Sequence, residues 1–360
     1  MLELADRLLP LVAAGRRVAV ATSIDVIGSS PHLAGTSMEV TADGGVIGSV
    51  SGGCVEEAAL RDCRALLVDG AARVRRFGFG DAAAAHAGLA CGGELDVLVH
   101  PADADVLGEL AEAAEGRAAV VAFITAGPAA LIGRAITPAT VGALPVPGIP
   151  ASAIRAALEG RRERGVSGPV VVECGDASLR LFVDVAAPQR RMVIGGATET
   201  AVALTAAAAA AGYRVTVCDV RGEFLSSARF PGAAEVVVGR PHEVVRAAGL
   251  TERDAVCVLG HDEDLDPLAL AAALDGGAGF VGAIGSRATA RSRRERLVDL
   301  GVDGTAIARL RMPIGLDIGA RTPAELAVAV LAEVLAVRNG LDAAPLRTGA
   351  GPVHRVTAAR

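Results

Sequence analysis

The chain has 360 residues, more than one ordinary hydrophobic core accommodates, so two domains are the default expectation. A formal net charge of -6, no Trp and one Tyr exclude the basic surface and stacking aromatics that nucleic-acid binding requires. The most apolar run, residues 201–211, is too short to span a bilayer, so we expect no membrane contact. The six cysteines form neither a regular pattern nor a CxxC pair, so we expect a cytoplasmic protein with reduced thiols.

The first predicted domain covers residues 1–101 and has an α/β pattern. Its expected elements, in chain order, are a helix over 2–14, strands over 17–23, 37–41 and 46–50, a helix over 57–67, and strands over 74–79 and 95–99. Asp43-Gly44 between two apolar runs predicts a β-hairpin. The hairpin leads directly into a loop that contains a cysteine.

That cysteine, Cys54, follows Gly52 and Gly53 and precedes the helix expected from residue 57. The unpaired N–H groups and the dipole at a helix N-terminus favour thiolate over thiol. A second cysteine, Cys91, is followed by Gly92 and another glycine. Either cysteine could instead be a small buried residue in a turn. Because glycine pairs let backbone and ligand approach closely, we take both thiols and their glycines as candidate binding residues. Whether the two thiols lie together stays open.

Residues 102–189 form a middle segment with a weaker pattern, in which no chemistry is assigned. We expect strands over 118–126 and 170–174, and a helix over 154–164 after a connector rich in proline and glycine. Residues 341–360 are taken as a tail.

Residues 190–340 alternate short apolar runs with helical stretches. The expected strands lie at 192–194, 214–219, 235–238, 255–259, 279–284 and around Ile314, and the expected helices at 199–211, 265–274, 289–300 and 323–338. This alternation predicts a parallel sheet with helices on both faces. The fold class is therefore α/β, with a C-terminal Rossmann-like, doubly wound parallel sheet behind an N-terminal α/β domain.

Gly195 and Gly196 open the first helix of this sheet, and Asp219 follows about 20 positions later. This is the opening of a Rossmann-type unit, in which the acidic residue can bind a ribose. The G-x-G-x-x-G pattern is incomplete, however, because Ala197 and Thr200 stand at the second and third glycine positions. NAD(P) is thus a weakly supported cofactor.

Gly285, Ser286 and Arg287 lie just before a predicted helix, at the edge of the sheet where ligands bind. Backbone donors, a hydroxyl and a permanent cation together outline a phosphate site. The competing interpretation is a helix cap beside a solvated arginine. His261, which precedes several aspartates, could suggest a metal, but capping is the commoner use of such a sequence.

With these residues the chain resembles the XdhC/CoxI family, the accessory proteins of xanthine dehydrogenase and related molybdenum hydroxylases. The resemblance rests on Gly28-Ser29-Ser30-Pro31 and residues 48–56 and 88–93 in the N-terminal part, and on residues 215–221, 229–231, 281–287 and 313–323 in the C-terminal part. The N-terminal segment is accordingly expected to be an XdhC/CoxI-type domain.

The resemblance implies an accessory role rather than a turnover reaction. Proteins of this kind bind molybdenum cofactor (molybdopterin), support its sulfuration, with a cysteine desulfurase as sulfur donor, and deliver it to a molybdenum hydroxylase client. A soft thiolate suits molybdenum or the transferred sulfur, which assigns that contact to Cys54, with Cys91 as a second candidate. Ser30 would offer a hydroxyl to the pterin, and the loop from Gly285 to Arg287 would hold the phosphate.

Two other classes stay open: an NAD(P)-dependent oxidoreductase that uses the Rossmann half, and a nucleotide-binding regulatory protein. A homodimer is compatible with the sequence, but the oligomeric state, the client enzyme and the cofactor variant are not specified by it.

Overall fold

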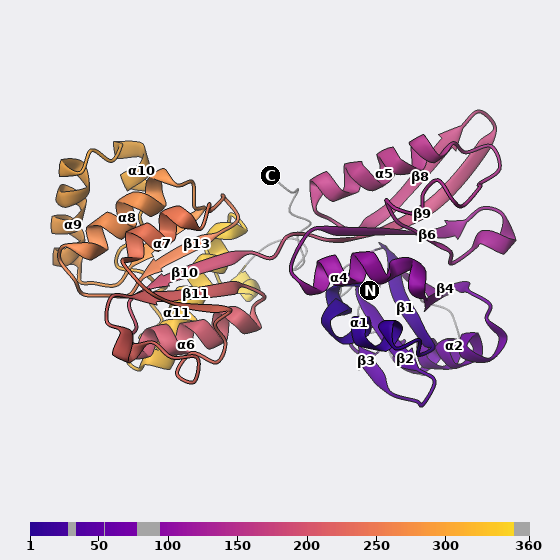
Figure 1. Cartoon of the computed structure of the whole chain (residues 1–360), viewed down its shortest axis with the longest axis horizontal. Helices are drawn as coiled ribbons and strands as arrows, with labels where there is room; N and C mark the ends of the chain where they lie inside the picture. Colours follow the sequence, from indigo (N-terminus) through magenta and orange to yellow (C-terminus); the bar gives the residue numbers. More distant parts are fainter. Residues whose placement is uncertain (28–33, 54, 78–93, 349–360) are drawn as a thin grey trace. The chain divides into compact units, whose positions relative to one another are not determined.

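The structure is a computed structural model that describes residues 1–27, 34–53, 55–77 and 94–348 (Figure 1). The chain divides into two compact units, and the boundary between them falls after Pro188. Nearly all of the middle segment 102–189 therefore belongs to the first unit. Each unit is described separately.

The first unit opens with a five-stranded antiparallel sheet in the order β3-β2-β1-β5-β4. Its elements are η1 (Leu2–Leu4), α1 (Ala5–Ala13), β1 (Val18–Ile27), β2 (Ser37–Thr41), β3 (Val46–Gly48), α2 (Glu56–Asp69), β4 (Arg73–Phe77) and β5 (Glu94–Ala102). The predicted hairpin is present, because β2 pairs with β3 in the register Val40↔Val46.

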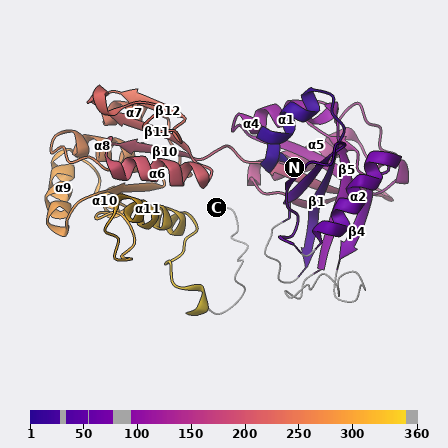
Figure 2. The same cartoon turned by 90° about the horizontal axis from the view of Figure 1, so that it is seen from below.

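The central strand β1 is buried on both faces, as its apolar sequence requires, whereas the edge strands β3 and β4 are largely exposed. Ala19 and Ala21 pack with α2 residues such as Cys63 on one face, along which α2 lies in Figure 2. Val18 and Val20 face the opposite way, toward α1 and a second sheet. Period-two alternation along a strand sends these neighbours to opposite faces, so each β1 residue has a core to enter.

The second sheet has four antiparallel strands in the order β7-β6-β9-β8. Its elements are η2 (Ala104–Val106), α4 (Leu107–Ala114), β6 (Ala119–Ala126), η3 (Ala129–Leu131), β7 (Ala135–Ile136), α5 (Ala151–Arg164), β8 (Gly168–Cys174) and β9 (Ala177–Ala186). Phe123 and Phe182 contribute to the core that the two sheets share, and α5 packs on the other face. Strand β9 was not expected from the sequence.

The second unit is a five-stranded parallel sheet in the order β12-β11-β10-β13-β14. Its elements are β10 (Arg191–Gly195), α6 (Glu199–Ala210), β11 (Arg214–Asp219), η4 (Gly222–Phe224), β12 (Glu235–Val238), α7 (Pro241–Ala247), β13 (Ala255–Val258), α8 (Leu265–Asp275), β14 (Phe280–Ala283), α9 (Arg287–Asp299), α10 (Gly304–Ala308), α11 (Pro323–Arg338) and η5 (Leu346–Thr348). Helices α6 and α11 cover one face and α7, α8 and α9 the other (Figure 1). The predicted doubly wound Rossmann-like sheet is confirmed.

The strand expected around Ile314 is wrong. Arg311 forms an isolated bridge with Gly282, and the Ile314 N–H donates to Ala283 O at 2.9 Å, but no sixth strand develops among the described residues. Pro313 has no backbone donor, and Gly315 takes a positive φ of 103°, so the chain leaves the edge of β14 after a few bonds.

Candidate functional site

The loop from Ser49 to Val55 connects the hairpin to α2, and its glycines are required by its backbone. Gly48 and Gly52 both have φ of +77°, and Gly53 has φ of +126°. A Cβ on Gly48 would lie 2.5 Å from Ser37 O. Glycine is the residue that adopts such dihedrals without steric cost. Gly52 and Gly53 are exposed.

The carboxylate of Glu56, at the first position of α2, is the centre around which this loop folds. Among the described residues it accepts hydrogen bonds from two hydroxyls and five backbone N–H groups. The donors are, to Oε1, Ser49 Oγ (2.7 Å), Val50 N (3.2 Å), Ser51 N (2.7 Å) and Gly52 N (2.8 Å), and, to Oε2, Ser51 Oγ (2.7 Å), Gly53 N (2.8 Å) and Val55 N (3.1 Å).

This ring of donors acts on the charge of Glu56. Although partial burial disfavours the ionised form, the hydrogen bonds from Ser49 and Ser51 lower the pKa of the carboxyl to about 2. Glu56 is therefore ionised at neutral pH. The sequence interpretation assigned it no role. A glycine pair directly before an acidic residue was the available signal, because successive backbone N–H groups can converge on one anion.

Four of the predicted site residues, Ser30, Cys54, Cys91 and Gly92, lie outside the described residues. The described residues that flank them are informative. Ile27, which precedes the segment with Ser30, pairs with Glu94. Phe77, which precedes the segment with Cys91, pairs with Leu95.

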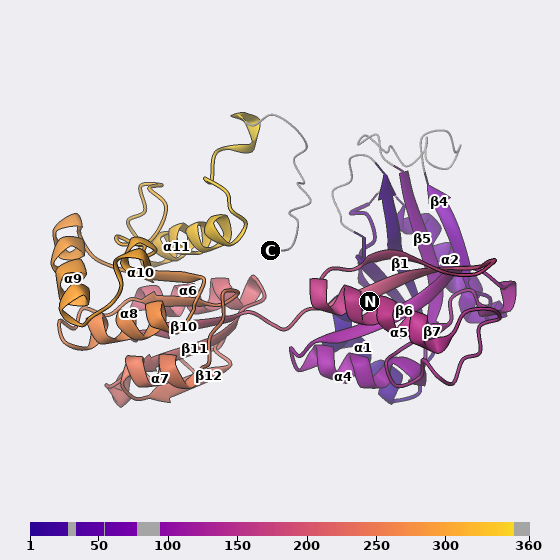
Figure 3. The same cartoon turned by 90° about the horizontal axis from the view of Figure 1, so that it is seen from above.

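The Ser49 loop starts nearer the middle of the sheet, since Ser49 N donates to Ser37 O and Ser37 pairs with Thr22, five residues before Ile27. In Figure 3 the carboxyl ends of β1 and β4 and the start of β5 share one end of this sheet. The described anchors of the segments with Ser30 and Cys91 thus lie at one end of the sheet, and the Ser49 loop starts about half a strand away from it.

In the second unit, Gly195 ends β10 and Gly196 follows it, at the point where the strand order reverses between β10 and β13. Gly196 has φ of +103°, and a Cβ there would lie 2.6 Å from the backbone N of Gly260. Leu259 N also donates to Gly195 O at 2.7 Å. The glycine is thus needed for the close approach of two protein loops, whatever ligand the crevice accepts.

Asp219 ends β11 as expected, but its carboxylate is bound within the protein. Oδ2 accepts the Ala197 N–H at 2.8 Å, and Arg221 donates from Nη2 to Oδ2 at 2.8 Å and from Nε to Oδ1 at 3.0 Å. Burial opposes ionisation, yet these bonds lower the pKa of Asp219 to about 2. The carboxylate and the N–H group that a dinucleotide would use therefore bind each other.

The Gly285-Ser286-Arg287 turn precedes α9. Ser286 is the N-cap of the helix, and its Oγ accepts the Thr289 N–H at 3.1 Å. Arg287 is exposed and makes no hydrogen bond or ion pair with any described residue. The hydroxyl thus has the capping role that the sequence allowed, while the cation remains available to a ligand.

A buried ion pair that the sequence did not reveal lies beside this turn. Arg293 Nη2 on α9 donates to Asp266 Oδ2 on α8 at 2.6 Å, and their side chains are 8% and 5% exposed. Burial raises the pKa of Asp266 to about 6, against the attraction of Arg293. The pair joins the first turn of α8 to the second turn of α9.

His261, also at this edge, is exposed. The neighbouring Asp262 accepts the N–H groups of Asp264 and Leu265 at 2.9 and 2.8 Å, as a helix-capping residue does. No cluster of three or more His, Cys, Asp or Glu with metal-binding geometry occurs in the part of the chain that the structure describes. None of the helices in that part is long and apolar enough to cross a membrane.

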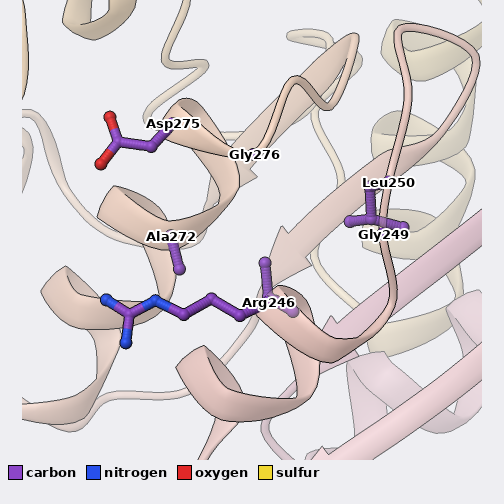
Figure 4. A pocket seen from close by; sticks show the side chains of 7 residues that line it. Arg246, Gly249, Leu250, Ala272, Asp275 and Gly276 are labelled. Atoms are coloured by element: carbon purple, nitrogen blue, oxygen red, sulfur yellow. The ribbon is translucent and has the colours of Figure 1, made fainter.

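A shallow pocket of about 230 Å³ lies elsewhere, between α7 and α8 (Figure 4). Arg246, Leu250, Ala272 and Asp275 are among the side chains that line it. These residues precede β13 and β14, so the pocket lies at the amino ends of the strands. Ligands of parallel sheets bind at the opposite edge, and we assign this pocket no function.

Two family models match the chain, one within each unit. A family model for the XdhC Rossmann domain matches residues 192–334, and a model for the XdhC and CoxI family matches residues 11–78. The chain belongs to the XdhC and CoxI family. The resemblance inferred from the motifs is thereby confirmed, and the XdhC Rossmann domain coincides with the parallel sheet from β10 to α11.

Two relatives of this XdhC-family chain match about half of it. It is 30% identical over 183 residues to the uncharacterized protein YqeB of Escherichia coli strain K12, covering 51% of this chain and 33% of YqeB. It is 27% identical over 164 residues to a probable xanthine dehydrogenase subunit of Bacillus subtilis strain 168, covering 46% of this chain and 48% of that protein. The chain thus spans between a third and a half of the length of these two relatives.

The match to a third relative extends over nearly the whole chain. The molybdenum cofactor insertion chaperone PaoD of Escherichia coli strain K12 is 27% identical over 325 residues, which cover 90% of this chain and 84% of PaoD. The crystal structure of a xanthine dehydrogenase from Bacillus halodurans is similar in fold, with a TM-score of 0.69, 22% identity, and coverage of 96% of this chain and 99% of that one.

Proposed function

We propose that this chain is an accessory protein that binds molybdenum cofactor, supports its sulfuration and delivers it to a xanthine dehydrogenase-type or CO dehydrogenase-type molybdenum hydroxylase. The observation that carries the proposal is the match to PaoD, named a molybdenum cofactor insertion chaperone, over 90% of the chain. A cysteine desulfurase would supply the sulfur.

Candidate cofactor contacts are proposed for each unit by itself, and those of the first unit lie on the candidate segments. Cys54 would contact molybdenum or the sulfur that is transferred, and Cys91 would assist, because a thiolate is a soft ligand that suits both. Ser30 would donate to the pterin. Gly52, Gly53 and Gly92 would allow close approach of the backbone. In the second unit, Gly195, Gly196 and Asp219 would shape the crevice, and Gly285, Ser286 and Arg287 would receive the phosphate.

The Cys54→Ala variant should lose most of the pterin that copurifies with the protein, because the substitution removes the sulfur and little volume. Pterin is quantified as its fluorescent oxidation product, together with activation of a client hydroxylase. Cys174→Ala is the matched control, since Cys174 is an exposed thiol of the same unit, on β8. Unchanged pterin and activation in a folded Cys54→Ala protein would remove Cys54 from the binding site.

The Arg287→Ala variant should bind the cofactor about tenfold or more weakly, equivalent to roughly 1.5–3 kcal/mol for a charge-assisted hydrogen bond to phosphate. Arg291→Ala is the control, because Arg291 is exposed one turn further along α9. Titration of each variant with cofactor gives the affinities. Equal affinities for Arg287→Ala and wild type would exclude this arginine from the phosphate site.

An NAD(P)-dependent oxidoreductase is the alternative function, and the second unit offers it little support. The Ala197 N–H and both oxygens of Asp219 are already hydrogen-bonded within the protein. A dinucleotide would have to displace Arg221 or bind elsewhere. Sustained oxidation of NADH or NADPH with a candidate substrate would favour the oxidoreductase over the accessory role.

A further inference from the structure

The buried pair of Asp266 and Arg293 makes contacts beyond the one between its members. Arg293 Nη1 also donates to Ile284 O at 3.3 Å, and Ile284 immediately precedes the turn of residues 285–287. On the other side of the pair, a Cβ on Gly260 would lie 2.7 Å from Asp266 Oδ1, so the carboxylate packs directly against backbone that follows β13. The pair therefore contacts both of the loops that leave β13 and β14 at their carboxyl ends.

The same row of contacts extends across β13 to the end of β10. A Cβ on Gly196 would lie 2.6 Å from the backbone N of Gly260, and Ile284 N donates to Val258 O at 2.9 Å. Gly196, Gly260, the ion pair and Ile284 thus form one continuous series of contacts along the carboxyl edge of the sheet. This series joins the two places in the second unit where ligand contacts are proposed.

An ion pair is not needed merely to pack α8 against α9. Removing two charges from water costs free energy that their attraction inside the protein often fails to offset, and apolar side chains of similar size can hold two helices together equally well. Apolar side chains cannot donate a hydrogen bond to the Ile284 carbonyl, however, whereas the guanidinium has donors for both the carboxylate and that carbonyl. The chemistry of the pair therefore indicates a role in fixing the loops that it contacts.

We propose that Asp266 and Arg293 are positioning residues: they fix the turn of residues 285–287 relative to the Gly195–Gly196 crevice, so that a phosphate-bearing ligand meets both in one geometry. The pair itself does not bind the ligand, since its side chains are only 5% and 8% exposed. This role deepens the phosphate-binding part of the function proposed above and rests on it. The effect of the pair on the turn is a property of the free protein, so its test requires no molybdenum cofactor.

The double variant Arg293→Met/Asp266→Asn tests this role. It removes one positive and one negative charge, so the net charge near the turn is unchanged, and replacing a whole buried pair by uncharged side chains is often neutral for stability. The matched control is Arg191→Met/Asp254→Asn. It removes another ion pair of the same unit, with an N–O distance of 2.7 Å, at the amino ends of β10 and β13.

Sulfate is the probe for the phosphate contact, because its charge does not change near neutral pH. Cofactor-free, full-length protein is titrated with sulfate at low ionic strength, and the NMR shifts of the amides of residues 285–287 report both the place of binding and the affinity. We expect the double variant to bind about tenfold more weakly than the wild type, as when a residue that orients a binding group is lost. The control variant should bind as the wild type does.

Thermal unfolding of the same samples separates positioning from a purely structural role. If the pair served stability alone, sulfate affinity would recover wherever the unfolding temperature does. Weaker sulfate binding in a double variant that unfolds at the wild-type temperature supports the positioning role. Equal sulfate affinities in the double variant and the wild type overturn it.

Gly260→Ala approaches the same contacts without removing any charge. Its methyl group would lie 2.7 Å from Asp266 Oδ1, so the carboxylate has to shift, and the guanidinium bound to it is displaced as well. If the double variant fails to fold, weaker sulfate binding by Gly260→Ala supports the positioning role, and unchanged binding counts against it.

The accessory function and the positioning role fail separately. If the wild type binds sulfate at residues 285–287 but does not bind molybdenum cofactor, the accessory function is rejected and the variants still decide the positioning role. If sulfate leaves the shifts of residues 285–287 unchanged in the wild type, the phosphate site and the positioning role are both rejected, whereas cofactor binding by the first unit is unaffected.

Discussion

Replacing Arg293 by methionine should destabilise the second unit by about 3–5 kcal/mol, the usual effect of removing one partner of a buried ion pair. The side chains of Arg293 and Asp266 are only 8% and 5% exposed, so little water reaches the carboxylate left behind. Thermal unfolding followed by calorimetry measures the loss. Arg291→Met, an exposed substitution on the same helix, should stay within about 0.5 kcal/mol of the wild type.

The effect of Arg293→Met should also depend on pH. Burial holds the pKa of Asp266 at about 6 even with its partner present, above the ordinary 3.8. Without the guanidinium the pKa rises further, so the folded variant binds a proton that the unfolded chain releases. Stability should therefore fall as pH rises from about 4 through and beyond 6. A double variant with Asp266→Asn should recover most of the loss, and failure to recover would assign the effect to packing.

The Glu39→Gln variant should be more stable than the wild type above pH 7, by about 3 kcal/mol. Glu39 lies on β2, is 0% exposed, and neither carboxylate oxygen has a hydrogen-bond partner among the described residues. Burial raises the pKa of its carboxyl from 4.5 to about 7, and the positive charges of the Met1 amino group and Arg7 only partly offset it.

Because the pKa of Glu39 is raised in the folded state, the direction in which stability changes with pH can be given. A raised pKa in the folded state means that the contribution of Glu39 is fully present below about 4.5 and is lost as pH rises through about 7. Unfolding in urea at pH 5 and pH 8 should show wild type and Glu39→Gln nearly equal at the lower pH and separated at the higher. Parallel curves at both pH values would mean that the carboxyl is solvated or paired.

Much of the fold could be predicted from the sequence because its signals are local. Alternation of apolar runs with helical stretches after Arg190 specifies a parallel sheet, and Asp43-Gly44 specifies the hairpin. The strand expected at Ile314 failed for a local reason that was visible beforehand, since Pro313 and Gly315 flank it. Strand β9 was missed although its signal is local, because it follows β8 directly after the turn at Gly175-Asp176 and its first residues alternate between exposed and buried.

The candidate site was predicted less completely, because the type of a residue indicates its chemistry but not which residues it will bind within the fold. Asp219 was correctly placed at the end of β11, yet no pattern showed that Ala197 and Arg221 would take up its carboxylate. The same holds for the Asp266–Arg293 pair, whose members are 27 residues apart. Glu56 is closer to predictable, since its donors all lie within seven residues of it.

The segments with Ser30 and Cys91 leave the first sheet at one end, where the constraints of core packing stop. Residues of β1 and β5 are buried on both faces and tolerate little change, whereas the connections begin only after the last ladder bonds, at Ile27↔Glu94 and Phe77↔Leu95. Substitutions in those connections should leave the described core of the first unit unchanged. On the function proposed above, we expect that changes of client or cargo preference can be confined to these connections while the scaffold is kept.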